Sequence, residues 1–75
     1  MLKIIGKNNC DSCDMTIIKL KEFKIEFEYI KMEDMDKNLF KQIKKNAIKK
    51  GVLSFPIVIL GDEYMTSKQL LDGLK

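Results

Sequence analysis

The sequence contains no histidine and no tryptophan, and all fourteen of its basic residues are lysines. Without arginine, the chain lacks the bidentate guanidinium contacts that usually recognise phosphates and base edges, which disfavours nucleic-acid binding. Without histidine, and with only two cysteines, it does not offer the four nitrogen or sulfur ligands of a structural zinc site. These absences turn attention to other roles for a small basic protein.

Long apolar segments and low-complexity tracts are also missing. The longest apolar run, residues 55–60, is far shorter than the roughly 20 residues that a membrane-spanning helix needs. The first residues do not form a basic and then apolar leader with a small-residue cleavage site. With 45% hydrophobic and 33% charged residues and a net charge of +3, the composition is that of a folded protein. We therefore expect one soluble, cytoplasmic domain over residues 1–75.

The two cysteines, Cys10 and Cys13, are separated by only two residues. Thiols at this spacing form one small disulfide ring and can be reduced again with little movement of the backbone. Such a short loop adds little stability, because the entropic stabilisation by a disulfide grows with the length of the loop that it closes. The spacing therefore favours redox exchange over a structural disulfide.

Four short segments have the pattern of β-strands. Residues 25–32 begin with alternating apolar and charged side chains, which is the period of a strand near a sheet edge with one covered face. Residues 57–60 are an uninterrupted apolar run suited to a strand buried on both faces, and Gly61 and Asp62 then form a tight turn. The predicted strands are residues 2–5, 25–32, 57–60 and 63–65.

Three segments have helical spacing. The first, residues 11–22, places Cys10 at its N-terminal edge, and the second, residues 37–50, stops at Gly51. Thr66 and Gln69 have the spacing of a capping box before a short closing helix. The side chains expected on the inner faces of the first two helices are Cys13, Ile17 and Leu20, and then Leu39, Phe40, Ile43 and Ala47.

The order β-α-β-α-β-β-α resembles the thioredoxin fold in its smallest form, with Cys-x-x-Cys after the first strand and Pro56 at the entrance to the third. The length, and Lys7 three residues before Cys10, are most similar to glutaredoxins and the glutaredoxin-like NrdH-type redoxins. The resemblance covers nearly the whole chain. It implies an α/β, thioredoxin-like fold of glutaredoxin type, with a four-stranded mixed sheet and helices on both faces.

The resemblance also implies an activity, that of a thiol-disulfide oxidoreductase that carries electrons in cell redox homeostasis. Cys10 corresponds to the thiol that attacks a substrate disulfide, and Cys13 to the partner that resolves the mixed disulfide. Pro56 corresponds to the cis-proline beside the disulfide, and the backbone of Phe55 to the edge that pairs with a bound substrate. The residues expected to bind substrate are Lys7, Asp11, Ser12, Phe55, Pro56 and Thr66.

The implied partners are protein disulfides, such as that of ribonucleotide reductase, and a reductant, either thioredoxin reductase or glutathione. No bound cofactor, metal, nucleic acid or membrane is expected, and a monomer suffices. Glutaredoxins that use glutathione commonly carry Gly-Gly and an acidic residue after the hairpin, where this chain has Met-Thr-Ser-Lys at residues 65–68. This difference disfavours glutathione, and the same four residues replace the Trp-Ser-Gly-Phe of NrdH-type redoxins. The chain is therefore expected to be a divergent member.

Charges near Cys10 oppose one another. The N-terminus of a helix and the ammonium group of Lys7 favour a thiolate, whereas Asp11 and Asp14 disfavour it. We therefore expect the pKa of Cys10 to lie only moderately below the value of about 8.5 for a free thiol. A weakly stabilised thiolate predicts a protein that acts as a reductant.

The alternative is a small soft-metal carrier that uses Cys10 and Cys13, because ferredoxin-like metal carriers of this length also place Cys-x-x-Cys after a first strand. Those carriers are built β-α-β-β-α-β and usually have Met or Thr just before the first cysteine. This chain has Asn8 and Asn9 there and ends in a predicted helix. The order of elements therefore favours the redox function.

Overall fold

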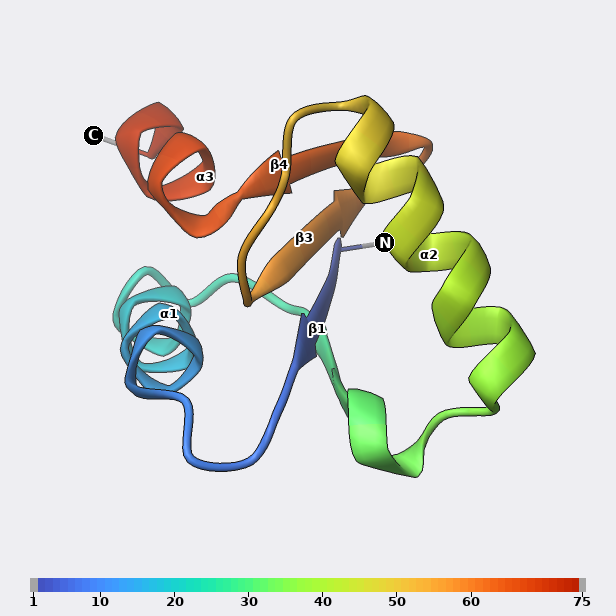
Figure 1. Ribbon diagram of the computed structural model, residues 1–75. Coiled ribbons are helices and arrows are strands. Elements are labelled where there is room, and N and C mark those ends of the chain that lie inside the picture. Colours follow the sequence, from blue (N-terminus) through green and yellow to red (C-terminus); the bar gives the residue numbers. More distant parts are fainter. Residues whose placement is uncertain (1, 75) are drawn as a thin grey trace.

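The computed structural model describes residues 2–74, and its elements follow the predicted order with one short addition, a 3₁₀ helix (η1) after the second strand. Figure 1 shows them in sequence. Their bounds are β1 Leu2–Gly6, α1 Asp11–Glu22, β2 Glu28–Lys31, η1 Met32–Asp34, α2 Lys37–Lys49, β3 Ile57–Leu60, β4 Glu63–Thr66 and α3 Ser67–Gly73.

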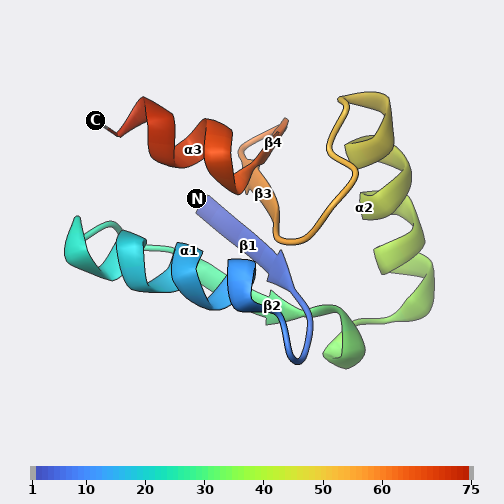
Figure 2. The same ribbon diagram turned by 60° about the vertical axis from the view of Figure 1, so that its left-hand side comes forward.

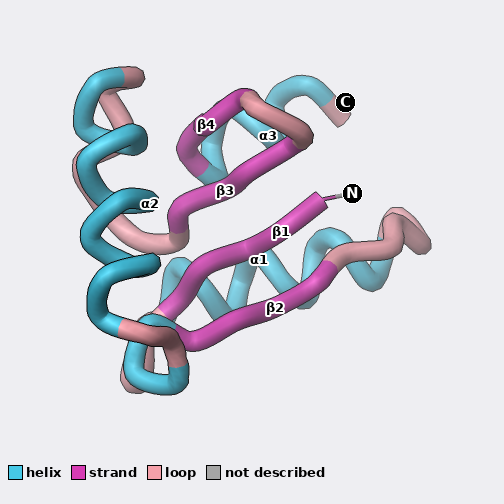
Figure 3. Tube along the Cα trace, turned by 90° about the vertical axis from the view of Figure 1, so that its right-hand side faces the viewer, coloured by secondary structure: helices cyan, strands magenta, loops and turns pink. Residues whose placement is uncertain are grey.

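The four strands form one mixed sheet in the order β2-β1-β3-β4. β1 pairs in parallel with β2 and antiparallel with β3, and β3 pairs antiparallel with β4 through the hairpin turn. Helices α1 and α3 cover one face of the sheet, and α2 alone covers the other (Figures 1 and 3). This confirms the predicted α/β architecture, with β3 in the interior of the sheet and β2 at an edge.

The apolar side chains divide between the two faces because successive residues of a strand point in opposite directions. Val58 of β3 packs toward α1 and α3, whereas its neighbours Ile57 and Ile59 pack toward α2. On the α1 side, Leu2, Ile4 and Leu20 complete the buried cluster. On the α2 side, the other buried members are Ile5, Ala47 and Val52.

The second strand is shorter than predicted. Residues 25–27 were expected to be extended within the sheet, but pairing with β1 begins at Glu28 and ends at Lys31. β1 is itself only five residues long, and four of these residues, 3–6, pair with β2. Ile25 and Phe27 still pack against the core beneath α1, which explains the alternating pattern.

One prediction of an inward-facing helix residue was wrong. Leu39 is 49% exposed, because the inner stripe of α2 follows Phe40, Ile43 and Ala47. In α1, Thr16 is fully buried and Ile17 only half-buried. The Thr16 hydroxyl donates to the Ser12 carbonyl oxygen at 2.7 Å, so its burial leaves no polar group unsatisfied.

Helix ends follow the predicted signals. The Thr66 hydroxyl accepts from the Gln69 amide, and the Gln69 side chain accepts from the Thr66 amide, so the capping box is formed. Gly51 has a φ of +81° just after the C-terminus of α2, a conformation that glycine adopts without steric cost. Figure 2 shows the chain leaving α2 there and running back to β3.

Candidate active site

Cys10 and Cys13 are joined by a disulfide at the N-terminus of α1. Cys10 is the N-cap residue, with an extended backbone, and its Sγ accepts a hydrogen bond from the Cys13 amide at 3.2 Å. Asn9 precedes it in the left-handed region, at a φ of +56°, which asparagine tolerates better than most residues. The sulfur of Cys10 therefore occupies the place of a capping oxygen, where the positive end of the helix dipole favours negative charge.

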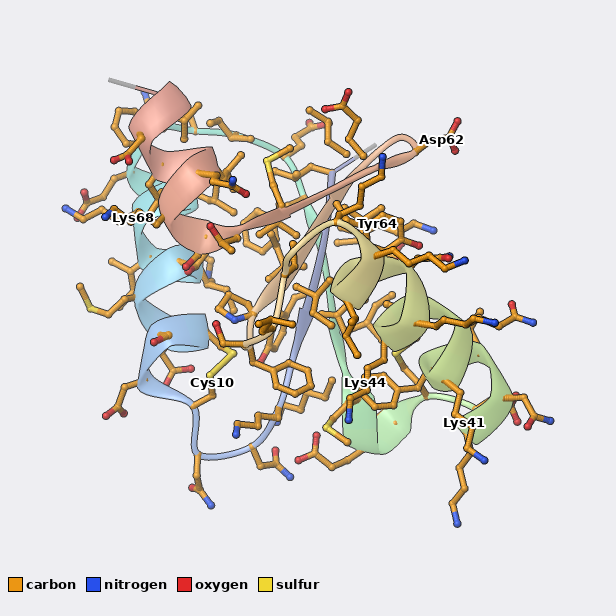
Figure 4. All side chains as sticks on the ribbon, turned by 45° about the horizontal axis from the view of Figure 1, so that its top comes forward. Cys10, Lys41, Lys44, Asp62, Tyr64 and Lys68 are labelled. Atoms are coloured by element: carbon orange, nitrogen blue, oxygen red, sulfur yellow. A yellow bond between two sulfur atoms is a disulfide. The ribbon has the colours of Figure 1, made fainter. Side chains whose placement is uncertain are left out.

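The two cysteines differ in their access to solvent. Cys10 keeps 8% of its surface exposed, whereas Cys13 is completely buried. Figure 4 shows the disulfide at the end of α1, close to the chain that leads into β3. Of the two sulfur-bearing residues, Cys10 is the one that a substrate could reach without displacing the helix.

The chain leading into β3 carries the second part of the site. The peptide bond between Phe55 and Pro56 is cis, and Pro56 is fully buried directly before β3. The ammonium group of Lys7 lies 5.4 Å from the centroid of the Phe55 ring, a cation-π distance. The Phe55 ring in turn stacks on Phe40 of α2, with centroids 6.0 Å apart. Lys7, Phe55 and Phe40 therefore link the loop before Cys10 to α2.

The loop between β1 and α1 is held by η1. The Asn8 amide donates to the Glu33 carboxylate at 2.8 Å, and this hydrogen bond is the largest cause that lowers the pKa of Glu33 below its usual value. The charges of Lys31 and Lys7 lower the Glu33 pKa further. Glu33 is thus ionised at neutral pH and ties η1 to the loop two residues before Cys10.

The ring of Tyr29 packs against Gly6, where β1 ends and the same loop begins. A Cβ added at Gly6 would lie 2.6 and 2.9 Å from two ring carbons of Tyr29. Only glycine, which has no side chain, therefore fits at the end of β1 against this ring. Burial raises the pKa of Tyr29, and the charges of Asp14 and Glu33 raise it further. The hydroxyl therefore stays neutral at physiological pH.

Acid should release the contact between Glu33 and the loop. Because the Glu33 pKa is lower in the folded protein than in the unfolded chain, this contact contributes fully above the ordinary pKa of 4.5 and is lost as the pH falls through the folded value. We expect the carbon-13 resonance of the Glu33 carboxyl and the proton resonance of the Asn8 amide to titrate together below pH 4.5. In the Glu33→Gln variant, the Asn8 resonance should no longer follow that transition; if it did, another group would be responsible.

The other predicted substrate-binding residues occupy different surroundings. Asp11 and Ser12 are exposed in the first turn of α1, between the cysteines. The hydroxyl and amide of Thr66 are both used by the capping box of α3. Substrate contact by these three residues stays a prediction.

The sequence did not single out Glu33, Tyr29 or Phe40 as parts of the site. Phe40 was expected only on the inner face of the second helix. No short motif connects residues 29–40 with residues 6–10, because the sheet pairing of β1 with β2 brings them together.

Among residues 2–74, no group of three or more histidine, cysteine, aspartate or glutamate side chains is placed to hold a metal ion. Within the same part of the chain, none of the helices combines the length and apolar character needed to cross a membrane.

Comparisons with known proteins agree with this geometry. The family model for glutaredoxin matches residues 2–65. The structure is similar to that of a glutaredoxin from Archaeoglobus fulgidus, with a TM-score of 0.70 and 24% identity over 99% of this chain and 85% of the other. It is also similar to NrdH-redoxin from Escherichia coli, with a TM-score of 0.68 and 20% identity over 99% of this chain and 93% of the other. No curated protein matches the sequence significantly.

The mixed four-stranded sheet with helices on both faces, and the disulfide at the start of α1, define an α/β protein of thioredoxin-like fold. More narrowly, the chain belongs to the glutaredoxin family, because the family model covers all but its last ten residues and the initial methionine. Membership in this family indicates thiol-disulfide redox chemistry in general.

Proposed function

We propose that the protein is a dithiol electron carrier that reduces protein disulfides with Cys10 and Cys13. The observation that carries this proposal is the difference between the two cysteines at the N-terminus of α1: Cys10 is the N-cap residue and keeps 8% of its surface exposed, whereas Cys13 is completely buried. A nucleophilic thiol needs access and a stabilised anion, whereas a resolving thiol needs only to reach the first sulfur. This arrangement supports the assignment of the two roles.

The reaction proceeds in two exchanges. The Cys10 thiolate attacks one sulfur of a substrate disulfide, a mixed disulfide forms, and the other substrate sulfur leaves as a thiolate. The Cys13 thiolate then attacks the Cys10 sulfur, which releases the second substrate thiolate and leaves the Cys10–Cys13 disulfide. Two electrons pass from the protein to the substrate, and a separate reductant restores the dithiol.

Lys7 and the cis-proline region define where the substrate would lie. The ammonium group of Lys7 is held above the Phe55 ring, and Pro56 fixes the chain that passes close to the disulfide. We place the substrate backbone along Phe55, with Asp11 and Ser12 beside the attacking sulfur and Thr66 farther along the same edge. The whole chain acts as one cytoplasmic domain in this proposal, and a monomer is sufficient for it.

The electron donor is proposed to be thioredoxin reductase rather than glutathione. Residues 65–68 depart from the Gly-Gly and acidic pattern of glutathione-using relatives, and Thr66 is committed to the capping box. The similar Escherichia coli protein is described as a glutaredoxin-like protein with a thioredoxin-like activity profile. Ribonucleotide reductase is one substrate that suits such a carrier.

Reducing the oxidised protein separately with each donor tests this proposal. We expect thioredoxin reductase with NADPH to reduce the Cys10–Cys13 disulfide at least about tenfold faster than millimolar glutathione does, because residues 65–68 lack the Gly-Gly and acidic pattern of glutathione-using relatives. The rate is followed by loss of NADPH absorbance and by alkylation of the freed thiols. Equal or faster reduction by glutathione would reverse the choice of donor, and reduction by neither would contradict an electron-carrier role.

A further inference from the structure

A hollow near the redox site is lined by apolar side chains and lysines that have no role in the proposed disulfide exchange. It is an open depression of about 420 Å³ between η1 and the first half of α2. Met32, Met35 and Phe40 supply its apolar part, and Glu33 lies on the side toward the loop before Cys10. Its remaining lining residues are Lys37, Lys41 and Lys44.

The three lysines share one face of α2, because they are spaced by four and then three residues. Helix α2 contains five lysines and no acidic residue, and among the residues that line the hollow the three lysines outnumber the single carboxylate, Glu33. Lys37 is also in the first turn, where the helix dipole disfavours a positive charge. Within residues 2–74, no ion pair joins any of these three lysines to another side chain. Carboxylates from outside the chain would relieve this unfavourable arrangement.

The hollow is linked to the redox site through two of its lining residues, Phe40 and Glu33. Phe40, which lines it, stacks on Phe55, and the Phe55 ring lies beneath Lys7. Glu33, which also lines it, accepts the hydrogen bond from Asn8. In Figure 4, Cys10, Lys44 and Lys41 lie along the same end of the molecule, away from Asp62. A polypeptide whose disulfide reaches Cys10 can therefore continue across this hollow.

We propose that the hollow docks an acidic segment that flanks the disulfide of a protein substrate, with one apolar side chain of that segment placed on Met32, Met35 and Phe40. This inference rests on the proposed function and names its substrate class. A protein segment fits better than a nucleic acid, because the floor is apolar and the chain has no arginine to grip phosphates. The lysines then act at the rim of the interface, where charge governs encounter and specificity.

The test compares disulfide-bonded peptides that differ only in the residues around the disulfide. One peptide carries Glu-Leu-Glu on both sides of it, and the other carries Gln-Leu-Gln. The protein variants are Lys41→Glu with Lys44→Glu, and the matched control Lys45→Glu with Lys49→Glu, which alters the same helix away from the hollow. Both double variants take the net charge from +3 to −1, so a difference between them reflects position. Circular dichroism confirms that each variant is folded.

The measured quantity is the ratio of kcat/KM for the acidic peptide to kcat/KM for the neutral one. We expect a ratio of about ten for the unmodified protein at low ionic strength, falling toward one in 0.5 M salt as the charges are screened. The control variant should keep most of this preference. The Lys41 and Lys44 variant should lose it or prefer the neutral peptide, and because each ratio is internal to one variant, a general loss of activity does not affect it.

Several results would overturn the proposal. A ratio near one for the unmodified protein, or an equal loss in both double variants, would show that the hollow does not select acidic segments. A sedimentation coefficient that changes with concentration and returns to the monomer value in the Lys41 and Lys44 variant would assign the hollow to a second copy of the chain. Competition by a short oligonucleotide stronger than by the acidic peptide would assign it to nucleic acid. Failure to reduce either peptide would instead contradict the proposed function itself.

Discussion

Replacing Cys10 with serine is expected to abolish disulfide reduction, with kcat/KM falling by at least about 1,000-fold. A serine hydroxyl stays protonated near neutral pH and cannot form a mixed disulfide, so the first exchange has no nucleophile. The rate is measured as precipitation of insulin chains in the presence of dithiothreitol. Replacing Cys13 with serine should instead allow the first exchange and trap the substrate on Cys10, as a covalent adduct seen by mass spectrometry.

These two variants separate the proposed roles, because each removes one thiol and leaves the other, three positions away, in place. The reversed result, with the adduct trapped in the Cys10 variant, would exchange the assignments of nucleophile and resolving thiol. Full activity in either variant, or stoichiometric metal in the purified protein, would remove the dithiol mechanism.

Replacing Leu20 with alanine should lower the free energy of unfolding by about 2–5 kcal/mol. Leu20 is completely buried on the inner face of α1, packed with Leu2, Ile4 and Val58, and its truncation leaves a cavity between the helix and the sheet. Small domains have total stabilities of only about 5–15 kcal/mol, so this loss is a large share. The measurement is urea denaturation followed by circular dichroism, with the disulfide kept oxidised.

The control for this variant is Leu53→Ala. Leu53 lies between α2 and β3 and is 78% exposed, so the same change of side chain should alter the free energy of unfolding by no more than about 0.5 kcal/mol. Similar losses in the two variants would mean that an effect on the unfolded state, rather than the burial of Leu20, determines the loss.

The order of elements could be predicted because each has a local signal. Helix α1 begins and ends where its spacing indicated, and the capping box at Thr66 marked the start of α3. The central position of β3 followed from its continuous apolar run, of which Ile57, Val58 and Ile59 are buried. The site was predicted to the extent that it depends on Cys-x-x-Cys and one proline, both of which are local in sequence.

The remaining features depend on which distant segments meet. Glu33 meets Asn8, and Tyr29 meets Gly6, because β1 and β2 pair in parallel, and no local pattern fixes that register. Thr16 looks like a surface residue until its hydroxyl is seen to bond to the Ser12 carbonyl oxygen within the helix. Leu39 was misplaced because periodicity gives a broad apolar stripe, and only packing against the sheet decides which edge of it is covered.

The hydrogen bond from the Cys13 amide to the Cys10 sulfur connects the redox state of the two cysteines to the stability of the first turn of α1. A thiolate accepts such a bond more strongly than a disulfide sulfur does, so the N-terminus of α1 is held more firmly in the reduced protein than in the oxidised one. By linkage, anything that grips this turn more tightly in one state also shifts the equilibrium between the two. A partner that contacts this turn would therefore bind the reduced and oxidised forms with different affinities.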